Sequence, residues 1–180
     1  MSRPEPALEI LFVPSLVAAH DELMATLLRE VDWDLRMRAR KTASYGVPYN
    51  YSEMSYPAAP MHPVIARVRD AVTEALAGAA DFRPNNCLVN LYETGRARMG
   101  YHFDATDELV PGTGVAIVSL GATRTLRFRL QTDREVERAR PLPGGSLLYM
   151  SPAVQGIWKH GVPREPGAGP RISLTYRWLR

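Results

Sequence analysis

Two residue types that bind metal ions stand one residue apart in the segment MGYHFDATDE, residues 99–108. If this segment is a strand, alternate side chains point to the same face, so His102 and Asp104 could hold one cation together. A His-x-Asp pair alone is weak evidence, because most such pairs are ordinary polar residues on a protein surface. A third ligand from elsewhere in the chain is therefore needed.

His160, in the segment QGIWKHGVP, is the candidate for that third ligand. The other histidines have simpler explanations, since His20 falls in a helical pattern and His62 could cap a second helix. Two imidazoles and one carboxylate with open coordination positions form the facial triad that binds non-haem Fe(II) in oxygenases. The lack of cysteine ligands argues against a structural zinc site, but the residues alone leave a catalytic zinc as an alternative.

The strand-like segment RISLTYR, near the end of the chain, indicates a co-substrate. One face would carry Arg171, Ser173, Thr175 and Arg177, and the other would carry Ile172, Leu174, Tyr176 and Trp178. Arginines that point into a barrel interior are costly unless anions pair with them. A dicarboxylate such as 2-oxoglutarate would pair with both, whereas arginines at an exposed sheet edge would need no partner. In NLY, Asn90 and Tyr92 share a face and could donate to the same ligand, or they follow simple strand alternation.

Length and composition bound the remaining possibilities. With 180 residues, of which 46% are hydrophobic, the chain has material for one sizeable core, so we expect a single domain over residues 1–180. No segment approaches the roughly 20 apolar residues that cross a bilayer. The apolar stretch ALEILFVPSLVAAH contains Glu9 and Pro14 and lacks a basic leader, so we expect a cytoplasmic protein without a membrane partner. Cys87 is the only cysteine, which excludes an internal disulfide.

The formal net charge is only +3, but all 22 basic residues except Lys41 and Lys159 are arginines. Four cations fall within RMRARK, residues 36–41, and would repel one another unless an anion or open solvent compensates. An arginine guanidinium matches phosphate and carboxylate geometry. The cluster therefore indicates either an anion-binding surface or an ordinary solvated face.

Two helices followed by a series of strands are predicted. SLVAAHDELMATLLREV (15–31) and HPVIARVRDAVTEALAG (62–78) have helical periodicity, with Ser15 as a possible cap of the first. After about residue 82 the pattern changes to short strand-like runs: NCLVNLY, GVAIVSL, RTLRFRL, GSLLYM and RISLTYRWL. The order predicts an α+β fold with an antiparallel sandwich or barrel packed against the helices.

Seven segments resemble, in order, the AlkB-like Fe(II)/2-oxoglutarate-dependent dioxygenases, most of all the branch that repairs alkylated bases. They are RKTASYGVPYNYS, FRPNNCLVNLYETG, GYHFD, VAIVSLGATRTLRFR, GGSLLYM, WKHGVP and RISLTYR, and they extend from about residue 38 to the end. The resemblance implies a double-stranded β-helix, or jelly roll, with N-terminal helices packed on the sheet. Residues 36–60 would form a substrate lid.

The resemblance also implies roles for individual residues. His102, Asp104 and His160 would bind Fe(II). Arg171 and Tyr92 would hold the distal carboxylate of 2-oxoglutarate, Arg177 and Asn90 would lie near its metal-chelating end, and Ser173 would lie beside them where the family usually has asparagine. With O₂ as the second co-substrate, an N-methyl group would leave a base as formaldehyde while 2-oxoglutarate becomes succinate.

In the lid, Arg38, Arg40 and Lys41 would contact phosphates, and Tyr45, Tyr49 or Tyr51 would stack on a flipped base or bond to it, although such tyrosines could also be packing residues. In repair members of the family, acidic residues that read the exocyclic amine of the damaged base follow closely after the metal-binding aspartate. Here Ala105 and Thr106 take those places. The chain also lacks a clear hydrophobic wedge that would fill a gap in a duplex, so single-stranded substrates are preferred.

Three functions are therefore compared. The first is a demethylase of N-alkylated bases in single-stranded nucleic acid, acting as a monomer. The second is the same oxygenase chemistry on a small molecule, peptide or protein side chain. The third is a non-catalytic jelly-roll binding module, against which the complete metal-binding and co-substrate-binding residue set argues.

Overall fold

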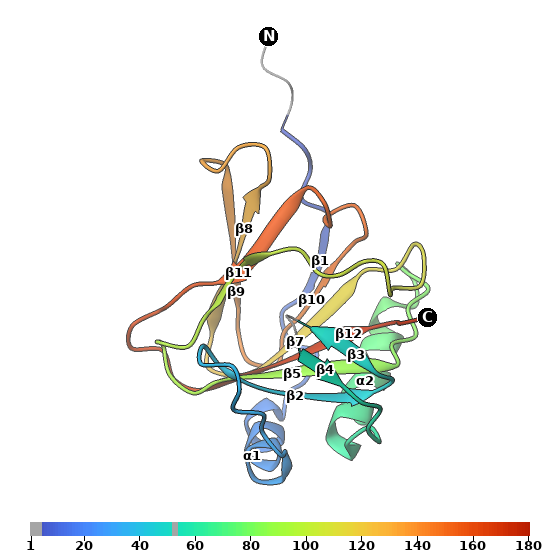
Figure 1. The fold of residues 1–180 in the computed structure, drawn as a ribbon, viewed down its shortest axis with the longest axis vertical. Coiled ribbons are helices and arrows are strands. Elements are labelled where there is room, and N and C mark those ends of the chain that lie inside the picture. The colour runs from blue at the N-terminus through green and yellow to red at the C-terminus, as the bar shows by residue number, and fades with distance from the viewer. Residues whose placement is uncertain (1–4, 52–53) are drawn as a thin grey trace.

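The computed structural model describes residues 5–51 and 54–180, and of Tyr51 only the backbone (Figure 1). The helices are α1 (His20–Glu30) and α2 (Pro63–Leu76). The strands before α2 are β1 (Ile10–Val13), β2 (Lys41–Gly46), β3 (Tyr49–Tyr51) and β4 (Met54–Tyr56). Those after it are β5 (Asn86–Tyr92), β6 (Met99–His102), β7 (Val115–Gly121), β8 (Arg124–Leu130), β9 (Glu137–Leu142), β10 (Leu147–Met150), β11 (Trp158–Val162) and β12 (Arg171–Arg177).

Two antiparallel sheets build the body of the protein. The larger has the order β1-β10-β7-β12-β5-β2, and the smaller has the order β6-β11-β8-β9. Strands β3 and β4 form a separate hairpin. A buried apolar cluster that includes Ile117, Phe128, Leu148 and Trp158 draws on both sheets and fills the space between them. This is the double-stranded β-helix of the predicted α+β fold.

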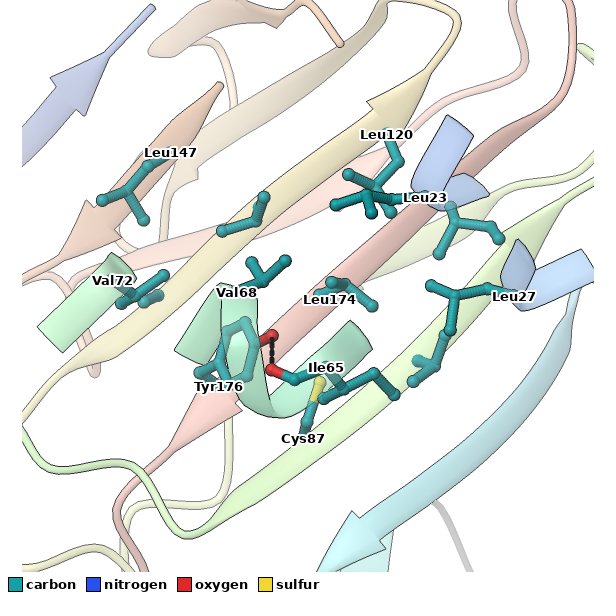
Figure 2. Close-up of a cluster of buried hydrophobic side chains, with 14 of the residues drawn as sticks. Leu23, Leu27, Ile65, Val68, Val72, Cys87, Leu120, Leu147, Leu174 and Tyr176 are labelled. Atoms are coloured by element: carbon teal, nitrogen blue, oxygen red, sulfur yellow. Dashed lines mark hydrogen bonds between the residues drawn. The ribbon is translucent and has the colours of Figure 1, made fainter. Parts of the chain in front are cut away.

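Both helices cover the outer face of the six-stranded sheet, on the side shown at the bottom of Figure 1. Leu23 and Leu27 of α1, with Val68 and Val72 of α2, pack against Leu174 and its neighbours (Figure 2). The Tyr176 hydroxyl donates to the carbonyl of Ile65 at 2.8 Å and so ties α2 to β12. Neither helix is long and apolar enough to span a bilayer.

The first helix begins later than its sequence pattern predicts. α1 starts at His20 rather than near Ser15, and its N-cap residue Ala19 makes no side-chain capping bond. The backbone N–H groups of Leu16 and Val17 both donate to the carbonyl of Gly145, at 2.7 and 3.0 Å, so a tertiary contact holds these residues outside the helix. The cap predicted for α2 is confirmed, because His62 accepts from the N–H of Val64 at 3.2 Å.

The position of β12 decides between the two interpretations of its arginines. β12 lies between β5 and β7 and pairs with both along its length. Its apolar residues face the helices, so its polar residues face the space between the sheets. Arg171 and Arg177 are 1% and 2% exposed. The alternative of an exposed sheet edge is therefore wrong, and both guanidinium groups lie inside the protein.

Candidate metal and 2-oxoglutarate site

The structure brings the three predicted metal ligands together. His102 ends β6 and lies opposite His160 of β11, with ring centroids 4.4 Å apart. Asp104 follows two residues later, and its Oδ2 atom is 3.3 Å from Nε2 of His160. One ligand atom from each residue lies within 4.8 Å of the other two. Three side chains from two separate segments thus converge on a space that can hold one metal ion.

Strand alternation does not explain the position of Asp104, because β6 ends at His102 and residues 103–106 have no regular structure. Tertiary contacts hold the carboxylate instead. Arg177 Nη2 donates to Oδ1 at 2.5 Å, and Gln155 Nε2 donates to Oδ2 at 3.1 Å. The Asp104 side chain is only 1% exposed as a result. Residues far along the chain therefore complete the site that the His-x-Asp spacing begins.

The electrostatics of the site suit a metal cation. Burial and the neighbouring His160 lower the pKa of His102 to about 4, so its imidazole is neutral at neutral pH, as a metal ligand must be. Burial opposes the charge of Asp104, but the charge of Arg177 and the hydrogen bond with His160 hold its pKa well below the ordinary value. Nδ1 of His102 lies 2.9 Å from the carbonyl of Gly100, which leaves Nε2 as the nitrogen directed to a metal. The donor set fits Fe(II).

Arg171 is the candidate anion-binding residue. Its Nη2 atom donates to Ser119 Oγ at 2.9 Å, and its guanidinium lies 5.1 Å from the ring centre of Tyr92. Nε and Nη1 are buried and make no hydrogen bond within the described residues. Burial lowers the pKa of this guanidinium, which reflects the cost of keeping the charge there. A carboxylate would supply the missing acceptors, so the site fits the distal end of 2-oxoglutarate.

Asn90 links the predicted co-substrate residues to an unexpected neighbour. Its Oδ1 accepts from Nε of Arg40 at 2.7 Å, and its Nδ2 donates to Ser173 Oγ at 3.4 Å. Arg40 is only 6% exposed. The predicted phosphate contact of Arg40 does not fit this placement, because the side chain turns inward from the start of β2.

The sequence patterns did not single out three further residues of the site. Ser119 and Gln155 contact Arg171 and Asp104, and Arg124 is fully buried and donates to the carbonyls of Ala97 and Pro163 at 2.8 and 2.6 Å. A signal existed for Ser119 and Arg124, since each falls on the inward, otherwise apolar face of its strand. Gln155 lies in a turn, where no periodicity could have identified it.

The predicted lid tyrosines lie in different environments. Tyr49 is buried, and the Arg177 guanidinium lies 4.7 Å from its ring centre, so this tyrosine borders the site. Tyr45 instead packs against the helix-side core and the His62 ring, at 6.2 Å, which does not fit a contact with a base. The side chain of Tyr51 lies outside the described part of the chain. Tyr56, which the sequence did not indicate, is buried and shares a hydrogen bond with Thr42 at 2.6 Å.

Beside the metal site is a hollow of about 550 Å³ lined by Asp104, Thr106 and Gln155, among others. Thr106 is exposed there, where it could meet a substrate. The two acids that follow it do not point the same way. Asp107 is exposed, whereas Glu108 is half-buried and accepts from Asn50 of β3 at 3.4 Å, so it contacts the hairpin.

A second hollow, of about 520 Å³, is strongly basic. Its charged residues are Arg38, Arg40, Lys41, Arg96, Arg98, Arg164 and one acid, Glu93. Lys41 pairs with Glu93 at 2.7 Å on the surface. The four arginines other than Arg40 are exposed, and within residues 5–51 and 54–180 none of them forms an ion pair. Of the predicted phosphate contacts, only Arg38 thus lies exposed without a carboxylate beside it.

Comparison with known proteins agrees with this geometry. Residues 19–177 match the family model described as the 2OG-Fe(II) oxygenase superfamily. The chain is 38% identical to mouse DNA oxidative demethylase ALKBH2 over 77% of its length and 33% identical to the human protein of that name over 89%. It spans 61% of the mouse protein and 69% of the human one. The solved structure of OsALKBH1 has a TM-score of 0.67 at 20% identity, covering 98% of this chain and 99% of that one, which shows a shared fold.

Proposed function

The chain belongs to the AlkB-like proteins of the 2OG-Fe(II) oxygenase superfamily, and we propose that it removes alkyl groups from bases in single-stranded nucleic acid. The observation that carries this proposal is a three-ligand metal site inside the same barrel as a buried arginine with two unused donors. A metal ligand set alone would fit several hydrolases. The added anion site is what an oxygenase needs for its dicarboxylate co-substrate.

When bound, Fe(II), 2-oxoglutarate and O₂ supply the oxidising power, and decarboxylation of 2-oxoglutarate yields succinate. The protein contributes orientation and exclusion of water. His102, Asp104 and His160 would hold the metal, and Arg171 with Tyr92 would fix the far carboxylate so that the co-substrate reaches it in one orientation. The near-complete burial of Asp104, His160 and Arg171 keeps that half of the site dry.

The basic hollow supports nucleic acid as the substrate. Six cations and one carboxylate line it, so this hollow is more positive than the whole protein, whose formal net charge is only +3. Residues Arg98–Tyr101 line a further hollow of about 430 Å³, and Phe103, Asp104 and Thr106 line the hollow of about 550 Å³. Residues directly before His102 in the sequence thus line one hollow, and residues that follow it line another. An extended single strand could follow this path, with its phosphates near the arginines.

One observation favours the second function. Ala105 and Thr106 provide no carboxylate next to Asp104, and Glu108 is engaged with Asn50, so recognition of a base amine by an acid at this position is weakened. The same oxygenase chemistry on a small molecule, peptide or protein side chain is therefore the alternative. A screen for formaldehyde release across methylated single- and double-stranded oligonucleotides, nucleosides and peptides separates the two. Release from peptides or nucleosides alone would refute the nucleic-acid proposal.

A binding experiment tests the path of the strand. Replacing Arg96, Arg98 and Arg164 with alanine should weaken binding to a single-stranded oligonucleotide. The slope of log K against log salt should fall by about 2, from about 0.7 for each phosphate contact. The matched control replaces three exposed arginines of the β8–β9 hairpin, Arg127, Arg134 and Arg138, and removes the same charge. Equal losses in both variants would mean that only net charge matters.

A further inference from the structure

Gln155 holds the metal-binding carboxylate at two points. Its Oε1 atom accepts from the backbone N–H of Asp104 at 3.1 Å, and its Nε2 atom donates to Oδ2 of the same residue, also at 3.1 Å. The backbone N–H of Asp104 needs an acceptor, so it must meet Oε1 of the carboxamide. The NH₂ end of the carboxamide is then the end that faces the carboxylate. One side chain therefore determines both the backbone and the side-chain position of Asp104.

This contact replaces support that the sheet does not give. Asp104 lies beyond the end of β6, so no ladder partner accepts from its N–H, and an unpaired buried N–H is costly. Gln155 supplies that acceptor. Arg177 donates to Oδ1 and Gln155 to Oδ2, so each oxygen of the carboxylate has its own donor. The oxygen that Gln155 contacts is also the one nearest to Nε2 of His160.

The turn that carries Gln155 is itself well fixed. Its neighbour Val154 is fully buried and accepts from the N–H of Trp158 at 2.9 Å. Trp158 is also fully buried and begins β11, the strand that contains His160. Gln155 thus connects the irregular segment after β6 to the start of the strand that bears the third ligand. Like Asp104, it also lines the hollow of about 550 Å³.

We propose that Gln155 is a positioning residue of the metal centre: it holds Asp104 in its ligating position before the metal arrives. Partners that orient a ligating carboxylate in this way typically raise metal affinity 10- to 100-fold. The inference rests on the metal-binding part of the proposed function and is independent of the substrate. Nothing in it requires that the protein acts on nucleic acid.

Metal binding by the full-length apoprotein tests the proposal. Gln155→Met keeps the length of the side chain and removes both hydrogen bonds, and Gln155→Ala is the second variant should methionine disturb folding. Gln131→Met is the matched control, because Gln131 is exposed and, in the part of the chain that the structure describes, only its backbone N–H makes a hydrogen bond, to the carbonyl of Ile157. We expect both Gln155 variants to bind Co(II) about 10- to 100-fold more weakly than wild type and the control to bind normally.

Two further readouts separate positioning from general stability. The visible absorption of the Co(II)-loaded protein should change in the Gln155 variants, because the carboxylate would reorient, and should stay constant in Gln131→Met. Wild-type Co(II) affinity and spectrum in the Gln155 variants would overturn the proposal, even if the apoprotein unfolded at a lower temperature. His102→Ala is the reference for the site itself. Should wild type bind Co(II) no better than this variant, the metal assignment fails and takes the Gln155 proposal with it.

Discussion

Replacing Arg171 with methionine should weaken 2-oxoglutarate binding and at the same time stabilise the apoprotein. The two effects have opposite signs because the buried guanidinium would bind the ligand's carboxylate but has no such partner in the apoprotein. It is 1% exposed, two of its three nitrogens make no hydrogen bond within the described residues, and the nearby charge of Arg124 adds repulsion. In the absence of 2-oxoglutarate this charge is a cost to folding.

The magnitudes follow from the contacts. Each charge-assisted hydrogen bond contributes about 1.5–3 kcal/mol, so two lost donors should weaken 2-oxoglutarate binding by about 3 kcal/mol or more, which is about 100-fold or more. Replacing a buried, uncompensated charge with an apolar side chain of similar volume can stabilise by about 1–4 kcal/mol. Loss of the bond to Ser119 Oγ offsets about 1 kcal/mol of that gain. A net stabilisation of about 0–3 kcal/mol remains.

Calorimetric titration of 2-oxoglutarate into the Mn(II)-loaded protein measures the first effect, and urea unfolding of the apoprotein measures the second. At this chain length, about 1 kcal/mol corresponds to about 2–4 °C in Tm. Arg134→Met, on the exposed β8–β9 hairpin, is the control and should change neither quantity. A variant with normal 2-oxoglutarate affinity, or one that lowers the unfolding free energy by more than about 1 kcal/mol, would refute the view that Arg171 is buried for an anion.

Two further predictions concern the metal ligands in the apoprotein. The pKa of His102 is lowered from 6.5 to about 4, so unfolding takes up a proton between these pH values. The free energy of unfolding should therefore have its full value above pH 6.5 and fall by about 2–3 kcal/mol as the pH drops towards 4. His102→Gln should show a flatter profile of urea-unfolding free energy over that range. Asp104→Ala should destabilise the protein by about 3–5 kcal/mol, since it leaves the buried Arg177 without that carboxylate. The double variant Asp104→Ala/Arg177→Met should recover most of this stability without recovering Co(II) binding. Equal stability of the single and double variants would contradict this.

Local patterns in the sequence were sufficient for the strands that carry much of the site. NCLVNLY and RTLRFRL coincide with β5 and β8, and the alternation in RISLTYR correctly separates the residues that face the helices from those that face the barrel. These successes share a cause, because a period of two is a property of the backbone itself and needs no knowledge of the partner strand. The sequence did not predict β9, because ERARPL is an exposed edge strand without the apolar alternation on which the other predictions depended.

The residue types and their spacing narrowed the chemistry to a metal site with iron or catalytic zinc, and the resemblance to the AlkB-like dioxygenases favoured iron with 2-oxoglutarate. Only the tertiary structure decided which contacts hold the residues of that site. Arg40 turns inward to Asn90, 50 residues away, and Gln155 reaches Asp104 across 51 residues. Such pairs depend on which strands become neighbours and in what register, and that is set by burial of the whole core rather than by any local pattern.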